Sequence, residues 1–192
     1  MNKKIFSENC NLSSYTTIKV GGVAEYFAEP RSVEELSYLI KWANLNKQRC
    51  QIIGAGSNLL INNIFIKGLV VCTKKLKSIK IEPYSGIIEA EAGVMLPTLS
   101  NSLAKNGLQG GEWAVGIPGT LGGAIYMNAG TGNLSLAKNL ISVKVINNKT
   151  LEKIEVEKKD IDFEYRFSSF QRNDLTIISA RLQFEPNGNL EK

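Results

Sequence analysis

The segment from residue 116 to residue 124 combines residue types that could bind an anion. It reads Gly116-Ile117-Pro118-Gly119-Thr120-Leu121-Gly122-Gly123-Ala124. Glycine permits a positive φ and a close approach to the backbone, and successive N–H groups in such a loop can form a nest for phosphate. Thr120 is suited to cap a short helix running towards Asn128. The alternative is a helix packed through its glycines against a neighbouring element, although such a helix would favour alanine.

A second glycine-rich segment, Gly54-Ala55-Gly56-Ser57-Asn58, follows a short apolar stretch that is typical of a buried strand. It differs from a Walker loop because no Gly-Lys-Ser/Thr follows. It also differs from the Rossmann fingerprint, which needs a third glycine and a helix. Taken alone, this segment is equally compatible with a phosphate-binding loop and with a tight turn that binds nothing.

Arg166 is a candidate for electrostatic catalysis, although its residue type alone favours a role on the surface. Its guanidinium is always charged and can bind a carboxylate through two hydrogen bonds. The alternative is a surface arginine paired with Glu164 or Asp162. The chain has 0 histidines, which excludes Ser-His-Asp and Cys-His catalytic pairs. Its 3 cysteines lack CxxC spacing, which excludes a Cys/His zinc site.

The composition indicates an ordinary globular protein rather than a nucleic-acid-binding or membrane protein. The chain has 192 residues, 43% hydrophobic and 21% charged, enough for one large domain or two lobes sharing a cleft. Its lysines are mostly scattered, so the net charge of +5 favours a solvated basic surface, and the alternative is a mild attraction for anionic substrates such as nucleotides. No apolar run reaches the ~18–20 residues of a membrane span. The unpaired cysteines favour the reducing cytoplasm.

Several elements must position these segments. Residues 23–29, 51–53, 69–73, 78–82, 87–92, 141–145, 151–156 and 176–184 are predicted strands, and residues 1–20 are expected to be irregular. Ser32 and Glu35 form a capping-box pattern that opens a helix ending near Asn46. A second helix is predicted over residues 96–106, with Gly107 as its stop signal. The pattern is α+β, with a first lobe at residues 1–74, a second at 75–186 and a polar tail at 187–192.

Motifs spread along the whole chain resemble the UDP-N-acetylenolpyruvoylglucosamine reductases. The segment at 116–124 is preceded by Leu108-Gln109-Gly110-Gly111-Glu112 and followed by Met127-Asn128-Ala129-Gly130. Three further segments agree in order and spacing: Thr16-Thr17-Ile18-Lys19-Val20-Gly21-Gly22, Gly54-Ala55-Gly56-Ser57-Asn58-Leu59-Leu60 and Tyr165-Arg166-Phe167-Ser168-Ser169. Several such motifs in the family's order are hard to produce by chance.

The resemblance implies the two-lobed α+β FAD-binding fold of the vanillyl-alcohol oxidase (PCMH) type. In that fold the FAD pyrophosphate lies between the lobes. The positions implied for cofactor binding are Gly54, Ala55, Gly56, Ser57, Asn58, Leu59, Ile117, Pro118, Gly119, Thr120, Gly122, Gly123 and Ala124. Thr17, Gly21 and Gly22 would form a supporting turn.

The resemblance also implies an activity. NADPH would reduce the flavin, and UDP-N-acetylglucosamine enolpyruvate would then be reduced to UDP-N-acetylmuramate, a peptidoglycan precursor. Arg166 matches the arginine that stabilises the enolate in this family. Tyr165 and Ser168 are weaker candidates for shaping the pocket of the UDP-sugar substrate. No metal, nucleic-acid partner or membrane insertion is implied.

The chain departs from the family pattern in two places. Thr131-Gly132-Asn133 stands where the family usually has Ala-Tyr-Gly, so an aromatic side chain is lost. The family's substrate-binding domain, with its serine proton donor and catalytic glutamate, has no counterpart before Lys192. Truncation would leave the chain incompetent for full turnover. A non-catalytic FAD- or nucleotide-binding remnant and a flavin oxidase of the same fold therefore remain alternatives.

Overall fold

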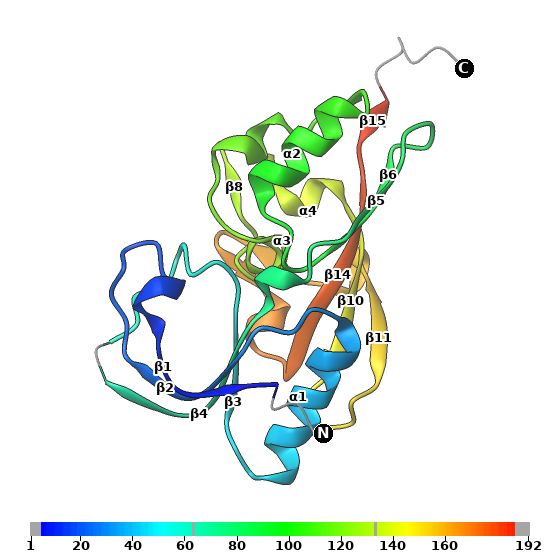
Figure 1. The fold of residues 1–192 in the computed structure, drawn as a ribbon. Coiled ribbons are helices and arrows are strands. Elements are labelled where there is room, and N and C mark those ends of the chain that lie inside the picture. Colours follow the sequence, from blue (N-terminus) through cyan, green and yellow to red (C-terminus); the bar gives the residue numbers. More distant parts are fainter. Residues whose placement is uncertain (1–4, 63, 133, 187–192) are drawn as a thin grey trace.

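The computed structural model describes residues 5–62, 64–132 and 134–186. A mixed sheet forms from the first part of the chain, with strand order β1-β2-β4-β3 (Figure 1). Its strands are β1 (Ser7–Asn11), β2 (Val23–Ala28), β3 (Cys50–Ile53) and β4 (Phe65–Cys72). Strands β2 and β3 both pair in parallel with β4. The connection between β2 and β3 is therefore a crossover, and α1 (Val33–Leu45) forms it.

Helix α1 begins and ends where the sequence predicts. Ser32 Oγ accepts a hydrogen bond from Glu35 N at 3.2 Å, and a Glu35 carboxylate oxygen accepts one from Arg31 N at 2.7 Å. The helix buries Leu36, Leu39, Ile40 and Ala43 on one face. It ends before Asn46, and Lys47 then adopts a φ of 53°.

The expectation that residues 1–20 are irregular is wrong for β1, which pairs antiparallel with β2. The polar sequence Ser7–Asn11 lacks the alternation of a half-buried strand, because β1 lies at the sheet edge and is mostly exposed. A 3-10 turn at Leu12–Tyr15 follows. Strand β1 forms because its backbone pairs with β2, and the pattern of its own residues does not reveal that pairing.

The second sheet is antiparallel throughout, in the order β11-β10-β14-β6-β5. Its strands are β5 (Ile79–Glu82), β6 (Ile87–Glu91), β10 (Leu140–Asn147), β11 (Lys153–Glu157) and β14 (Leu175–Gln183). Helices α2 (Leu96–Lys105), α3 (Leu121–Tyr126) and α4 (Leu136–Asn139) lie over one face and enclose a core with it. Gly107, with a φ of 65°, follows α2 as predicted.

Short two-stranded ribbons complete the fold. They pair β7 (Leu108–Gln109) with β15 (Glu185–Pro186), β8 (Gly130–Thr131) with β9 (Leu134–Ser135), and β12 (Phe163–Glu164) with β13 (Phe167–Ser168). Further 3-10 turns lie at Thr73–Lys75, Glu112–Gly116, Lys158–Asp160 and Ser169–Gln171. No helix in the described part of the chain is both long and apolar enough to cross a bilayer.

The two sheets share a hydrophobic core. Leu36, Leu39 and Ile40 of α1 pack in one cluster with Ile146 of β10 and Ile178 of β14. The boundary expected at residue 74 falls between the last strand of the first sheet and the first strand of the second. The division into FAD-binding lobes at 1–74 and 75–186 stays a prediction, and the tail at 187–192 lies outside the described residues.

Candidate functional site

A cavity of about 790 Å³ lies between the two sheets and reaches both glycine-rich segments. Ligand pockets for small molecules typically measure about 300–1,000 Å³. Every position nominated for cofactor binding lines it: Gly54, Ala55, Gly56, Ser57, Asn58, Leu59, Ile117, Pro118, Gly119, Thr120, Gly122, Gly123 and Ala124. Arg166 lines it as well. The fold thus brings together segments that are far apart in the sequence.

The first loop leaves β3 with its N–H groups free. Among the described residues, no acceptor bonds to the backbone N–H groups of residues 55–58. Gly56 has a φ of 67°, and a Cβ there would overlap the Tyr15 carbonyl oxygen. Its own carbonyl accepts a hydrogen bond from Thr17 N at 3.4 Å, in the turn expected to support the site. The segment is therefore a tight turn that also presents several free donors to the cavity.

The second loop is fixed at its ends and open at its centre. Leu96 N donates to Gly119 O at 2.9 Å, and Leu121 N donates to Val94 O at 2.7 Å. In contrast, within the described part of the chain the N–H groups of Gly119 and Thr120 have no acceptor. Gly119 has a φ of 133°, which L side chains rarely adopt, and a Cβ there would meet nothing within 4 Å. Backbone geometry, rather than crowding, requires glycine at this position.

Thr120 caps α3 as predicted, because its Oγ1 accepts a hydrogen bond from Gly123 N at 3.4 Å. Gly122 fits the alternative in which the helix packs through its glycines against a neighbouring element. A Cβ added there would lie 2.9 Å from Ala92 Cβ. The added Cβ of Gly116, in contrast, meets nothing within 4 Å. The glycines of this segment therefore have different tasks, since some allow packing and others leave the backbone accessible.

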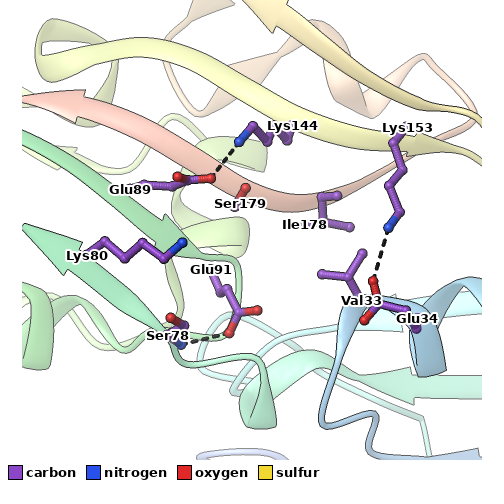
Figure 2. A pocket seen from close by; sticks show the side chains of 10 residues that line it. All are labelled: Val33, Glu34, Ser78, Lys80, Glu89, Glu91, Lys144, Lys153, Ile178 and Ser179. Atoms are coloured by element: carbon purple, nitrogen blue, oxygen red, sulfur yellow. Dashed lines mark hydrogen bonds and ion pairs between the residues drawn. The ribbon is translucent and has the colours of Figure 1, made fainter.

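The cavity suits an anionic ligand. Arg166 is the one charged residue among the described residues that line it, and no Asp or Glu is among them. A smaller cavity of about 270 Å³ on the polar face of the second sheet is different (Figure 2). Its lysines are partly neutralised: Lys144 pairs with Glu89 at 2.6 Å and Lys153 with Glu34 at 3.2 Å. Because positive and negative side chains alternate there, the smaller cavity favours neither an anionic nor a cationic ligand.

Arg166 lies in the two-residue loop of the β12–β13 hairpin. Its φ is 55°, an uncommon conformation for a residue with a side chain. Its Nη2 donates to Gly130 O at 3.2 Å, and its guanidinium lies 5.1 Å from the centre of the Tyr165 ring. The described residues include no acid in an ion pair with Arg166, so the alternative pairing with Glu164 or Asp162 is absent there. One hydrogen bond to a carbonyl leaves most of its donors available.

Tyr165 and Ser168 do not line the cavity, although both flank Arg166. Tyr165 is 89% exposed. Ser168 is fully buried, and its Oγ donates to Tyr126 O at 2.9 Å. Asn133, one residue of the motif departure, lies outside the described residues, and Thr131 lines the cavity.

The cavity includes residues beyond the positions nominated for binding. At the Arg166 end these are Tyr126, Met127, Ala129, Gly130, Phe170 and Gln171. At the other end, the walls come from β3, from the start of β14 and from the turn after β10, with Cys50, Thr176 and Asn148 as examples. Thr176 Oγ1 donates to Asn148 Oδ1 at 2.7 Å, and burial raises the pKa of the Cys50 thiol to about 12. Met127, Ala129 and Gly130 belong to a segment that resembles the reductases, whereas the other residues lie outside every such segment and reach the cavity only through the tertiary fold.

These features fit FAD. The free N–H donors of the two loops, the open backbone at Gly119 and the absence of carboxylates from the described lining suit a pyrophosphate. The apolar walls at Ile52, Ile117 and Ile177 suit aromatic rings.

Comparisons with known proteins agree with this geometry. Residues 24–150 match a family model described as FAD binding domain. Over 187 residues, the chain is 69% identical to a UDP-N-acetylenolpyruvoylglucosamine reductase of Prochlorococcus marinus subsp. pastoris, covering 97% of this chain and 63% of that protein. It is 43% identical to the reductase of a Synechococcus species, covering 91% of this chain and 57% of that protein. The chain thus spans only part of the length of these relatives.

Solved structures give the same result. The UDP-N-acetylenolpyruvylglucosamine reductase of Thermus caldophilus superposes with a TM-score of 0.77 at 29% identity, over 95% of this chain and 64% of that one. An alkyldihydroxyacetonephosphate synthase superposes with a TM-score of 0.64 at 16% identity, over 88% of this chain and 34% of that one, which shows the fold alone. The resemblance and the two-lobed α+β fold expected from the sequence are confirmed.

Proposed function

Because this chain belongs to the FAD-binding domain family, we propose that it is the cofactor-binding part of a UDP-N-acetylenolpyruvoylglucosamine reductase. The proposed reaction reduces UDP-N-acetylglucosamine enolpyruvate to UDP-N-acetylmuramate with NADPH. One observation carries the proposal most strongly. Two glycine-rich loops from different lobes converge on one cavity, whose single charged residue in the described lining is Arg166.

The free backbone donors of the two loops would hold the pyrophosphate of FAD. They come from residues 55–58 on one side and from Gly119 and Thr120 on the other. Bound FAD would supply hydride transfer between NADPH and the enolpyruvyl double bond. The protein contributes position and charge, because its donors are already oriented by strand ends and by the capped helix α3.

Arg166 would bind the carboxylate of the enolpyruvyl group. Reduction of the adjoining double bond places negative charge beside that carboxylate, and a fixed guanidinium stabilises the charge more as it develops. Its free donors permit the two-bond geometry that carboxylates favour. Tyr165 lies against the guanidinium and would limit its movement. Ser168 holds Tyr126 O with its hydroxyl, so we assign it a positioning role and not proton donation.

The remaining assignments depend on this reaction. NADPH and a UDP-sugar are the proposed small-molecule substrates. The free thiols of Cys10, Cys50 and Cys72, together with these substrates, support a cytoplasmic location.

A second candidate function is an FAD-binding module without turnover. It requires only the free backbone donors of the two glycine-rich loops, which the described part of the chain supplies. A flavin oxidase with the same fold is less favoured, because the cavity keeps Arg166 in the motif of the reductases.

An anaerobic titration tests the proposal. The purified chain is loaded with FAD, and its visible spectrum is recorded before and after addition of NADPH and then of the enolpyruvyl substrate. Bleaching by NADPH followed by recovery on substrate addition supports the reductase, and bleaching without recovery supports the module without turnover. A chain that takes up no FAD contradicts both. Arg166→Ala is the matched variant, and we expect it to retain FAD while losing recovery.

A further inference from the structure

The loop that carries Arg166 has little stability of its own. The strands β12 (Phe163–Glu164) and β13 (Phe167–Ser168) contribute only the pairs Phe163 with Ser168 and Glu164 with Phe167. A single positive φ at the second central residue is typical of a type II turn, where glycine is preferred. Arg166 occupies that position, so contacts from outside the hairpin must hold it in this conformation.

Those contacts come from side chains that bridge the hairpin to the end of α3. Asn128 Nδ2 donates to Glu164 O at 2.9 Å, and Ser168 Oγ donates to Tyr126 O at 2.9 Å. Gln171 Nε2 donates to Tyr126 O at 2.8 Å and to Arg166 O at 3.2 Å. Gln171 is thus the side chain that ties the peptide of Arg166 itself to the wall of the cavity.

From these contacts we infer that Gln171 is a positioning residue for Arg166. Its amide has two N–H donors, and the two carbonyls that they reach belong to α3 and to the arginine loop. Both Gln171 and Arg166 line the cavity beside Tyr126. By linking the two segments, Gln171 fixes the distance from the guanidinium to a ligand held by the glycine loops. The inference depends on the proposed function, because it gives Arg166 a carboxylate to bind.

Two substitutions distinguish the hydrogen bonds of Gln171 from the packing of its side chain against the cavity. Gln171→Met keeps the length of the side chain and removes both donors. Gln171→Lys keeps donors that can reach the two carbonyls. We expect Gln171→Met to weaken binding of the enolpyruvyl substrate to the FAD-loaded chain about tenfold, since small misplacement of a binding group is costly. Gln171→Lys should stay within about threefold of the original chain, because the bridge is kept.

The ligand comparison shows whether the effect passes through Arg166. UDP-N-acetylglucosamine lacks the enolpyruvyl carboxylate, so Gln171→Met should change its affinity less than about twofold. Both affinities follow from the change in flavin absorbance on titration. In an Arg166→Ala background, Gln171→Met should cause no further loss of substrate affinity. The inference is wrong if the losses of affinity from the two substitutions multiply, or if the affinities for both ligands fall equally. In either case Gln171 contributes only a contact surface to the cavity.

A measurement without ligand tests separately whether Gln171 holds the backbone of Arg166 in place. We expect ¹⁵N relaxation of the Arg166 amide to show an ordered backbone in the original chain and in Gln171→Lys, and increased motion in Gln171→Met. An Arg166 amide that is equally ordered in Gln171→Met overturns the inference. If the original FAD-loaded chain binds both ligands equally well, the proposed function fails, while the relaxation data still decide whether Gln171 holds Arg166.

Discussion

Gly54 of the first glycine loop and Thr120 of the second are in direct contact, so that a Cβ added to Gly54 would overlap Thr120 Oγ1. The same Oγ1 accepts a hydrogen bond from Gly123 N and caps α3. Gly54 is also tied to its own sheet, because Cys72 Sγ donates to its carbonyl oxygen at 3.3 Å. The distance between the two sets of free N–H donors therefore depends on this contact.

Gly54→Ala should separate the two loops. We expect a loss of about 1–3 kcal/mol in the free energy of unfolding, as for other additions to a packed site. FAD affinity should fall with it, measured by quenching of flavin fluorescence. Adding Thr120→Ala removes the overlapping oxygen, so the double variant should be less destabilised than the sum of the two single changes. Strict additivity would show that the contact does not set the loop positions.

Gly119→Ala and Gly116→Ala form a matched pair, because an added Cβ meets nothing within 4 Å at either position. Only Gly119 has a positive φ, of 133°. We expect Gly119→Ala to cost about 1–3 kcal/mol of stability through backbone strain and to weaken FAD binding. Gly116→Ala should leave thermal unfolding and FAD affinity close to those of the original chain. Equal effects of the two substitutions would contradict this assignment.

Arg166→Gly should improve stability while harming binding. The φ of 55° strains an arginine but not a glycine. Relief of the left-handed conformation is expected to contribute about 1 kcal/mol, seen as a higher melting temperature. Affinity for the enolpyruvyl substrate should fall, because the guanidinium is gone. Arg166→Ala loses the same charge and keeps the strain, so its melting temperature should not rise. A rise in both variants would trace the effect to charge rather than backbone.

The Cys50 thiol should react slowly with alkylating reagents. Burial raises its pKa from 9.0 to about 12, and the charge of Asp174 adds to the effect. The folded chain thus disfavours the thiolate, and this contribution to stability is complete below pH 9.0 and is lost as the pH rises towards about 12. We expect chemical denaturation to show falling stability over that window, with a smaller fall in Cys50→Ala. FAD should slow the alkylation further, since Cys50 lines the cavity.

The sequence by itself determined the local features of this protein. Ser32 and Glu35 fixed the start of α1, and Gly107 marked the end of α2, because capping depends on residues a few positions apart. The glycine loops and the arginine motif were evident for the same reason, since the conformation of a short loop is specified by its own residues. The role assigned to each nominated residue remains a prediction, although the loops and Arg166 share one cavity.

The tertiary structure alone decided which distant groups meet. Strand β1 exists because β2 offers it a backbone partner, although its polar residues show no strand pattern. Gln171 reaches Tyr126 O, and Asn148 and Thr176 reach the far end of the cavity, only in the folded chain. Tyr165 and Ser168 lie beside Arg166 and outside the cavity lining, which motif position does not disclose. Such contacts depend on sheet register and packing, which join residues that the sequence keeps far apart.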